Sequence, residues 1–122
     1  MEFSLDNGSG QYRIKSYHQG IFTVNEITHS CSIIIMPDQL ISPWRPQNIE
    51  ALQTEDFQLL LDFQPQIVLL GTGKSLIFPN RDLFSNLYEK KIGVEIMDTK
   101  AACRTYMLLM AEGRKVAAAL LA

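Results

Sequence analysis

The sequence predicts an α/β fold: a single three-layer domain with a central mixed sheet flanked by helices and an additional N-terminal β-hairpin. The chain has 122 residues, the usual size of one domain, and 47% of them are hydrophobic, which is enough to build a core. From about residue 50 onward, helix-like and strand-like segments alternate as they do in parallel sheets with crossover connections. No repeat or linker interrupts the sequence, so residues 1–122 are expected to form one domain. The polar, glycine-rich residues 1–10 are expected to be flexible.

The N-terminal part predicts short strands. Residues 12–18 alternate weakly between two sides, which is typical of a half-exposed strand. The pair Gln19-Gly20 separates them from the apolar residues 21–24, so we expect a hairpin. Residues 32–36 contain three consecutive isoleucines and predict a buried strand.

Three prolines, Pro37, Pro43 and Pro46, break the next segment. Each fixes its own backbone and restricts the residue before it, so we expect no regular structure there. Trp44 and Arg45 lie between the last two prolines, in a loop that should be rigid. Two interpretations stay open for Trp44: it packs the loop onto the domain, or it contacts another protein. We take Trp44 and Arg45 as the candidate partner surface.

Helices and strands then alternate. Thr54 is the candidate N-cap of a helix that Pro65 ends, and the acidic residues after Thr54 suit the positive end of the helix dipole. Residues 67–70 predict a central strand, and residues 76–78 predict another short strand. Asn80 is the candidate cap of the next helix, whose closing lysine pair suits its C-terminal end.

The C-terminal third continues the alternation. Residues 93–97 predict a strand, and Asp98 caps a helix that should end at Gly113 in a left-handed conformation. Residues 114–122 are ambiguous. Their four alanines favour a helix, whereas their position after a glycine stop favours a strand returning to the sheet. We predict a strand.

Composition argues against several functions. Eleven basic and thirteen acidic side chains give a net charge of −2 without a basic cluster, so no nucleic-acid partner is expected. The two cysteines and two histidines form no metal-binding spacing, and no metal or cofactor is predicted. No apolar stretch approaches the roughly 20 residues of a membrane span, and the start of the chain lacks signal-peptide features. These observations predict a cytoplasmic protein with reduced thiols.

Gly73-Lys74-Ser75 resembles the end of a nucleotide-binding P-loop. A P-loop also needs a glycine five residues before that Gly, where this chain has Val68, and a helix opening at the Lys-Ser pair. Pro79 delays the next helix. The glycines are therefore interpreted as the tight end of a buried strand.

Polar residues follow two strands that we expect to be parallel neighbours. Ligands of open α/β sheets lie at such strand ends, near helix N-termini. Cys103 and Arg104 of the last helix should lie one turn beyond this edge. The candidate ligand crevice therefore comprises Gly71, Thr72, Gly73, Asp98, Thr99, Cys103 and Arg104.

Each chemically interesting residue has a structural alternative. Asp98 is either an N-cap or a catalytic acid. Cys103 falls at helical spacing with apolar residues and so is expected in the core, whereas a reactive thiolate needs an electropositive, partly open site. Arg104 either binds an anion or pairs with a nearby acid. No nucleophile–base arrangement or acid pair can be assembled from the spacing, so no catalytic residue is assigned.

Several motifs together resemble the Mth-domain family of unknown function, which includes a mitochondrial complex I assembly factor and an adipogenesis-associated protein. The similarity covers most of residues 30–122. It is most specific in the last thirty residues. The motifs are LLGTG at 69–73, FP at 78–79, GVEIMDT at 93–99, AACRTY at 101–106 and EGRKVAAALL at 112–121.

The resemblance implies a compact α/β domain without an agreed catalytic activity. It indicates a bacterial-type, soluble accessory protein that assists assembly of a respiratory complex such as complex I through a protein partner. One departure is Met107, where many relatives are expected to have Asn. The alternative hypotheses are a small-molecule-binding domain or enzyme that uses the predicted crevice, and a structural homo-oligomer.

Overall fold

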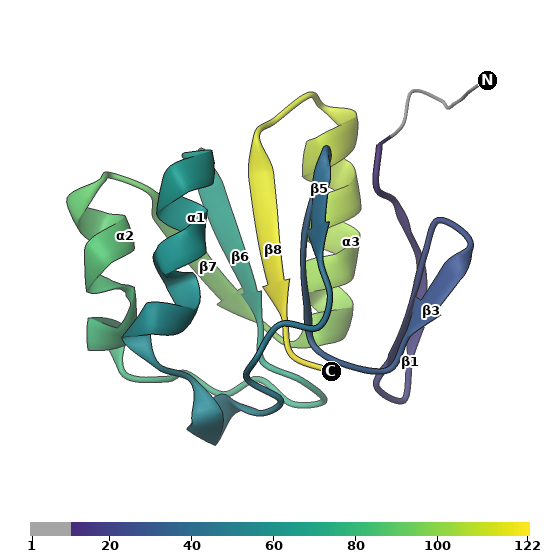
Figure 1. Cartoon of the computed structure of the whole chain (residues 1–122), viewed down its shortest axis with the longest axis horizontal. Coiled ribbons are helices and arrows are strands. Elements are labelled where there is room, and N and C mark those ends of the chain that lie inside the picture. Colours follow the sequence, from purple (N-terminus) through teal and green to yellow (C-terminus); the bar gives the residue numbers. More distant parts are fainter. Residues whose placement is uncertain (1–10) are drawn as a thin grey trace.

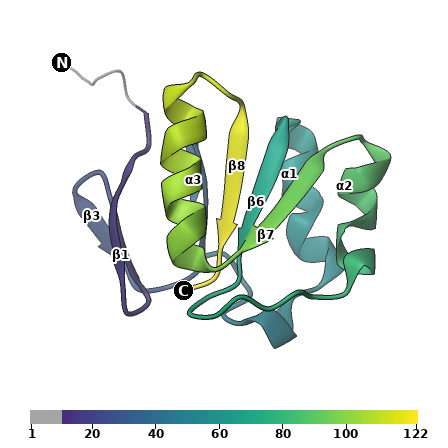
Figure 2. The same ribbon diagram turned by 180° about the vertical axis from the view of Figure 1, so that it is seen from behind.

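The computed structural model describes residues 11–122, so the predicted flexibility of residues 1–10 lies outside the described residues. Shorter helices cover one face of a central sheet and the longest helix covers the other, as Figures 1 and 2 show from opposite sides. This confirms the predicted fold class. The helical segments are η1 (Ile49–Ala51), η2 (Thr54–Phe57), α1 (Gln58–Phe63), η3 (Arg81–Phe84), α2 (Ser85–Glu89) and α3 (Thr99–Ala111).

The central sheet consists of β4 (Ile33–Met36), β5 (Gln39–Ile41), β6 (Ile67–Gly71), β7 (Gly93–Met97) and β8 (Val116–Leu120). Their order is β5-β4-β8-β6-β7. β6 pairs in parallel with β7 and β8, whereas β4 pairs antiparallel with β5 and β8. The sheet is therefore mixed, as predicted.

The C-terminal segment is a strand, as predicted, despite its alanines. β8 lies between β4 and β6, and all five of its residues are buried. Ala117 and Ala119 belong to the core under α1 and α2, while Ala118 and Leu120 belong to the core under α3. Burial on both faces of the sheet outweighs the helix propensity of alanine here.

A second sheet packs beside α3. It consists of β1 (Ile14–His18), β2 (Ile21–Val24) and β3 (Ile27–His29), in that order and antiparallel. The predicted hairpin between β1 and β2 is confirmed, and positive φ angles at Gln19 (51°) and Gly20 (79°) give it a type I′ turn. β3 was not expected, because three residues carry too short a pattern.

The predicted helix starts are confirmed at Asn80 and Asp98, whose side chains accept from Asp82 N and Ala101 N. The prediction of Thr54 as N-cap is wrong. Gln53 holds that position, because the Asp56 carboxylate accepts from the Gln53 N–H at 2.8 Å and closes the turn one residue earlier.

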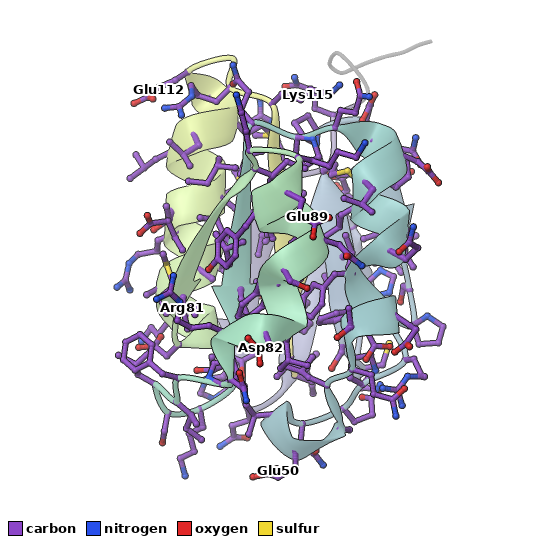
Figure 3. The ribbon with its side chains drawn as sticks, turned by 90° about the vertical axis from the view of Figure 1, so that its left-hand side faces the viewer. Glu50, Arg81, Asp82, Glu89, Glu112 and Lys115 are labelled. Atoms are coloured by element: carbon purple, nitrogen blue, oxygen red, sulfur yellow. The ribbon has the colours of Figure 1, made fainter. Side chains whose placement is uncertain are left out.

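Two further local predictions need correction. Residues 76–78 form no strand but an exposed loop. The proline-rich segment does contain regular structure, since β5 pairs with β4 before the second proline. The helices of the α1–α2 layer carry charged residues outward, and Figure 3 labels exposed ones, among them Arg81, Asp82 and Glu89.

Candidate functional site

The ends of β6 and β7 meet the start of α3 at one edge of the sheet, as predicted. Thr72 N donates to Met97 O and Thr99 N donates to Gly73 O, both at 2.9 Å. Gly71 lies so close to α3 that a Cβ atom on it would be 2.8 Å from Thr99 Oγ1 and 2.9 Å from Thr99 Cα. A glycine is therefore required for this contact between strand and helix.

The two threonine hydroxyls at this edge bond to the protein itself. Thr99 is fully buried, and its Oγ1 accepts from Gly73 N and donates to Leu121 O, both at 2.7 Å. Thr72 Oγ1 donates to Ser75 O at 2.6 Å. We call Gly71, Thr72, Gly73, Asp98 and Thr99 the strand-end cluster. Its bonds tie β6, α3 and the end of β8 together, and its use as a ligand crevice stays a prediction.

The proline-flanked loop is also tied to the protein. Trp44 is 2% exposed, contacts Phe57 edge to face, and donates from Nε1 to Asp56 O at 3.1 Å. Arg45 donates to both Asp56 carboxylate oxygens, at 2.8 and 2.7 Å. The Trp44 ring thus lies in the core, away from any surface. A partner contact at this loop stays a prediction that rests on the exposed Arg45.

Arg45 also sets the charge state of Asp56. Burial acts to raise the pKa of this carboxyl group, but the hydrogen bonds from Arg45 and from Gln53 N outweigh it. The pKa of Asp56 therefore lies below its ordinary value, and the carboxylate stays ionised at neutral pH.

A groove of about 590 Å³ runs between β1 and α3. The two elements lie side by side at the left of Figure 2. One wall is four consecutive residues of an edge strand, and the other is a single stripe of α3 at helical spacing. The groove is lined by Ile14, Lys15, Ser16, Tyr17, Lys100, Cys103, Arg104, Met107 and Leu108.

The structure thus divides the predicted crevice residues into two groups. Cys103 and Arg104 line the groove, whereas the strand-end cluster does not. Sequence reasoning missed the strand wall and also Lys100 and Leu108. A signal for the helical wall was present, since positions 100, 103, 104, 107 and 108 share one helix face. The strand wall had no such signal, because it depends on how the hairpin packs.

The groove has an apolar interior and a basic rim. Cys103 and Met107 lie inside, Leu108 is 66% exposed, and Lys15, Lys100 and Arg104 are the exposed charged lining residues. None of the nine lining residues is acidic. Such a surface suits a ligand that is apolar and negatively charged.

Cys103 has the features of a buried structural cysteine. It is 6% exposed, and burial raises the pKa of its thiol to about 12, although Arg104 acts to lower it. The thiol is therefore neutral at physiological pH, and a neutral thiol is a poor nucleophile. Tyr106, one turn further, donates from its hydroxyl to Tyr12 O at 2.8 Å and so holds the N-terminal sheet against α3.

Met107 makes an unusual contact with the strand wall. The backbone N–H of Ile14 donates to the Met107 sulfur at 3.2 Å. A thioether is a weak acceptor. This position is where the resemblance leads us to expect Asn, whose amide oxygen would be a stronger acceptor for the same N–H.

Within residues 11–122, no group of three or more His, Cys, Asp or Glu side chains is arranged to hold a metal ion. No helix in that part of the chain is long and apolar enough to cross a membrane.

Comparison with known proteins identifies relatives across the whole domain. Residues 14–121 match the family described as "Protein of unknown function (DUF498/DUF598)". The "13 kDa major membrane protein" of Francisella tularensis is 27% identical over 103 residues, which cover 84% of this chain and 84% of that protein. The "NADH dehydrogenase (ubiquinone) 1 alpha subcomplex assembly factor 3" of Rattus norvegicus is 30% identical over 112 residues. That match covers 88% of this chain but 59% of the rat protein.

A solved structure supports the same assignment. The solution structure of a Bordetella pertussis protein, described as a Mth938-like domain, superposes with a TM-score of 0.83 at 27% sequence identity. The superposition covers 99% of this chain and 92% of that one. These matches confirm the family resemblance inferred from the sequence motifs.

Proposed function

Since the chain belongs to the DUF498/DUF598 family of proteins of unknown function, we propose that it is a non-enzymatic accessory protein that binds a partner polypeptide. This contact would assist the assembly of a respiratory membrane complex such as complex I. The observation that carries the proposal is the open groove between β1 and α3, which is apolar inside and basic at its rim. The bacterial, cytoplasmic location expected from the sequence is part of the same proposal.

The chemistry of the groove supports binding over catalysis. Its thiol, at Cys103, is protonated at neutral pH because burial raises its pKa. Its remaining ionisable groups are the cations Lys15, Lys100 and Arg104 and the phenol of Tyr17, whose pKa is raised, mainly by burial. Cations held at the rim of an apolar groove give electrostatic complementarity to an acidic partner.

Relatives supply the biological setting. Several proteins about 30% identical to this chain are named as complex I assembly factors, and another relative is named as a membrane protein. The chain spans 59% of the rat assembly factor's length, so partners contacted by the remainder of that protein are not transferred here.

The test is deletion and rescue in the native host, with assembled complex I measured on native gels. We expect deletion to lower the amount of assembled complex and the wild-type gene to restore it. The double variant Lys100→Glu/Arg104→Glu should fail to restore it. The matched control Arg81→Glu/Lys90→Glu, which reverses two exposed charges on η3 and the α2 side, should restore it. Normal complex I after deletion would overturn the assembly function.

A small apolar carboxylate is a second candidate for the same groove. The observation that favours it is that Arg104, for which anion binding is one of the two interpretations, lines an apolar cavity large enough for a small ligand. A thermal-shift screen of carboxylates tests this directly. A ligand at about 100 times its dissociation constant should raise the free energy of unfolding by about 2.7 kcal/mol. If no carboxylate stabilises the wild type more than Arg104→Gln, this candidate is removed.

A further inference from the structure

One wall of the groove is the unpaired edge of a sheet. β1 is the first strand of the order β1-β2-β3, so its outer side has no partner strand among the described residues. The groove is lined by four consecutive residues of this strand, from Ile14 to Tyr17, opposite one stripe of α3. A strand edge beside an apolar stripe is the arrangement that accepts an added strand from another protein.

The register of the hairpin shows which backbone groups point outward. His18 and Ile21 flank the type I′ turn and form a hydrogen-bonded pair. The next pair, Tyr17 and Phe22, is therefore a non-hydrogen-bonded pair. The backbone N–H and C=O of Tyr17 consequently point away from β2, along the open edge.

Ile14 provides independent evidence of that edge. Its N–H also points away from β2, and it reaches the Met107 sulfur at 3.2 Å. The Ile14 N–H is thus bonded to a weak acceptor on α3, and a carbonyl oxygen of an incoming strand would have to displace the flexible Met107 side chain to reach it. A bulge between Ile14 and Ser16 separates the two outward-facing positions, Ile14 and Tyr17. An incoming strand would therefore pair with only a short stretch of β1.

Charge selects the kind of strand. Lys15, Lys100 and Arg104 line the groove, no acid does, and the exposed ion pair of Lys15 with Glu26 (3.4 Å) is too solvated to neutralise the rim strongly. A second copy of β1 would bring another Lys15 against this rim, which disfavours pairing between copies. An acidic strand with alternate apolar residues would place its apolar side chains against Cys103 and Met107.

We propose that the groove binds an extended, acidic segment of a partner protein by strand addition to the outer edge of β1. This binding mode rests on the proposed partner-binding function and specifies its ligand. The incoming strand would accept from Ile14 N and pair with the outward backbone groups of Tyr17. Its carboxylates would lie near Lys100 and Arg104.

The experiment uses the full chain and two fluorescein-labelled decapeptides, one alternating valine with glutamate and one alternating valine with lysine. Binding is measured by fluorescence polarisation at low and moderate salt. We expect the glutamate peptide to bind at least about tenfold more tightly than the lysine peptide, with a difference that shrinks as salt screens the charges.

A matched pair of variants isolates the backbone contribution. Tyr17→Ala and Tyr17→Pro both remove the ring, but only the proline removes the outward N–H, at an edge position that tolerates proline. We expect Tyr17→Pro to bind the glutamate peptide about tenfold more weakly than Tyr17→Ala. The proline variant loses one backbone hydrogen bond to the peptide, and its pyrrolidine ring clashes with the incoming strand. Thr28→Pro, on the opposite edge strand β3, should leave binding unchanged.

A measurement on the wild type covers the case in which Tyr17→Pro does not fold. Amide hydrogen exchange at Ile14 and Tyr17 should slow when the glutamate peptide saturates the protein.

Equal binding of both peptides, no binding of either, equal affinity of the Tyr17 variants, or unchanged exchange would each overturn strand addition. If these fail while deletion still lowers complex I, the binding mode is wrong and the assembly function stands. If deletion has no effect on complex I while the peptide binds as expected, the assembly function is wrong and the binding mode stands.

Discussion

The strand-end cluster and the groove differ in what their polar groups are bonded to. In the cluster, the Thr99 hydroxyl bonds Gly73 N and Leu121 O, and Gly71 approaches α3 so closely that no side chain fits. In the groove, Ile14 N has only a sulfur acceptor, and the side chains of Lys100 and Arg104 are exposed. The polar groups of the cluster are therefore bonded within the fold, while the groove is lined by ordinary apolar residues and by basic residues whose side chains are exposed.

Because of this difference, mutations in the two regions should have different consequences. A substitution in the strand-end cluster or in the bonded proline-flanked loop should cost stability first. A substitution at the groove should leave stability nearly unchanged and alter binding.

Trp44→Ala should give the largest loss of stability. The ring is buried and packed on Phe57, and its removal leaves a cavity and an unpaired Asp56 carbonyl. We expect a loss of about 3–5 kcal/mol in the free energy of unfolding, measured by urea denaturation. Leu108→Ala, on the exposed rim of the groove, is the control and should change it by less than about 0.5 kcal/mol. Similar losses for both would contradict the separation.

Thr99→Val should have the next largest effect. The change keeps the side-chain shape but leaves the buried Gly73 N–H and Leu121 C=O without a partner. We expect a loss of about 2–4 kcal/mol in the free energy of unfolding. Thr105→Val, half-buried on the same helix, is the matched control and should cost less than about 1 kcal/mol. If Thr99→Val binds a metabolite less well without losing stability, the cluster is a ligand site after all.

The sequence predicted the fold because strong local signals agreed with the final packing. The apolar run of β6, the cap at Asp98 and the glycine stop at Gly113, with φ of +78°, are all short-range features. β8 was predictable only by its position, since its composition favours a helix. β3 and β5 are three residues long, and they form because neighbouring strands supply their hydrogen bonds.

The candidate site was less predictable for a physical reason. The adjacency of Gly73 and Thr99 followed from the parallel topology. Whether their polar atoms face a ligand or one another depends on distances of a few ångströms that sequence spacing does not contain. The groove depends on the packing of the β1 hairpin against α3, and these two segments are more than 80 residues apart in the sequence. Ile14 and Met107, which are in contact, are separated by 93 positions.

The ion pair of the proline-flanked loop predicts a pH dependence. The folded-state pKa of Asp56 lies below its unfolded value, so its contribution is present above the unfolded pKa, near 4. The contribution is lost as pH falls through the folded pKa. Asp56→Asn should therefore be less stable than the wild type at pH 7, and the difference should shrink as urea denaturation is repeated towards pH 3. A difference that is constant with pH would show that the charge of Asp56 contributes nothing.

The smallest expected effect lies in the groove, at the Cys103 thiol. In a Cys31→Ser background, reaction with Ellman's reagent at pH 7.5 reports on Cys103 alone, and its pKa of about 12 should make the reaction slow and steeply faster with rising pH. Arg104 acts to lower that pKa, so Arg104→Gln should slow the reaction further, by about twofold to fivefold, because the charge is exposed and screened. Arg81→Gln is the control and should leave the rate unchanged. A faster reaction in Arg104→Gln would mean that Arg104 covers the thiol more than it stabilises the thiolate, and the groove would then be more closed than its lining residues indicate.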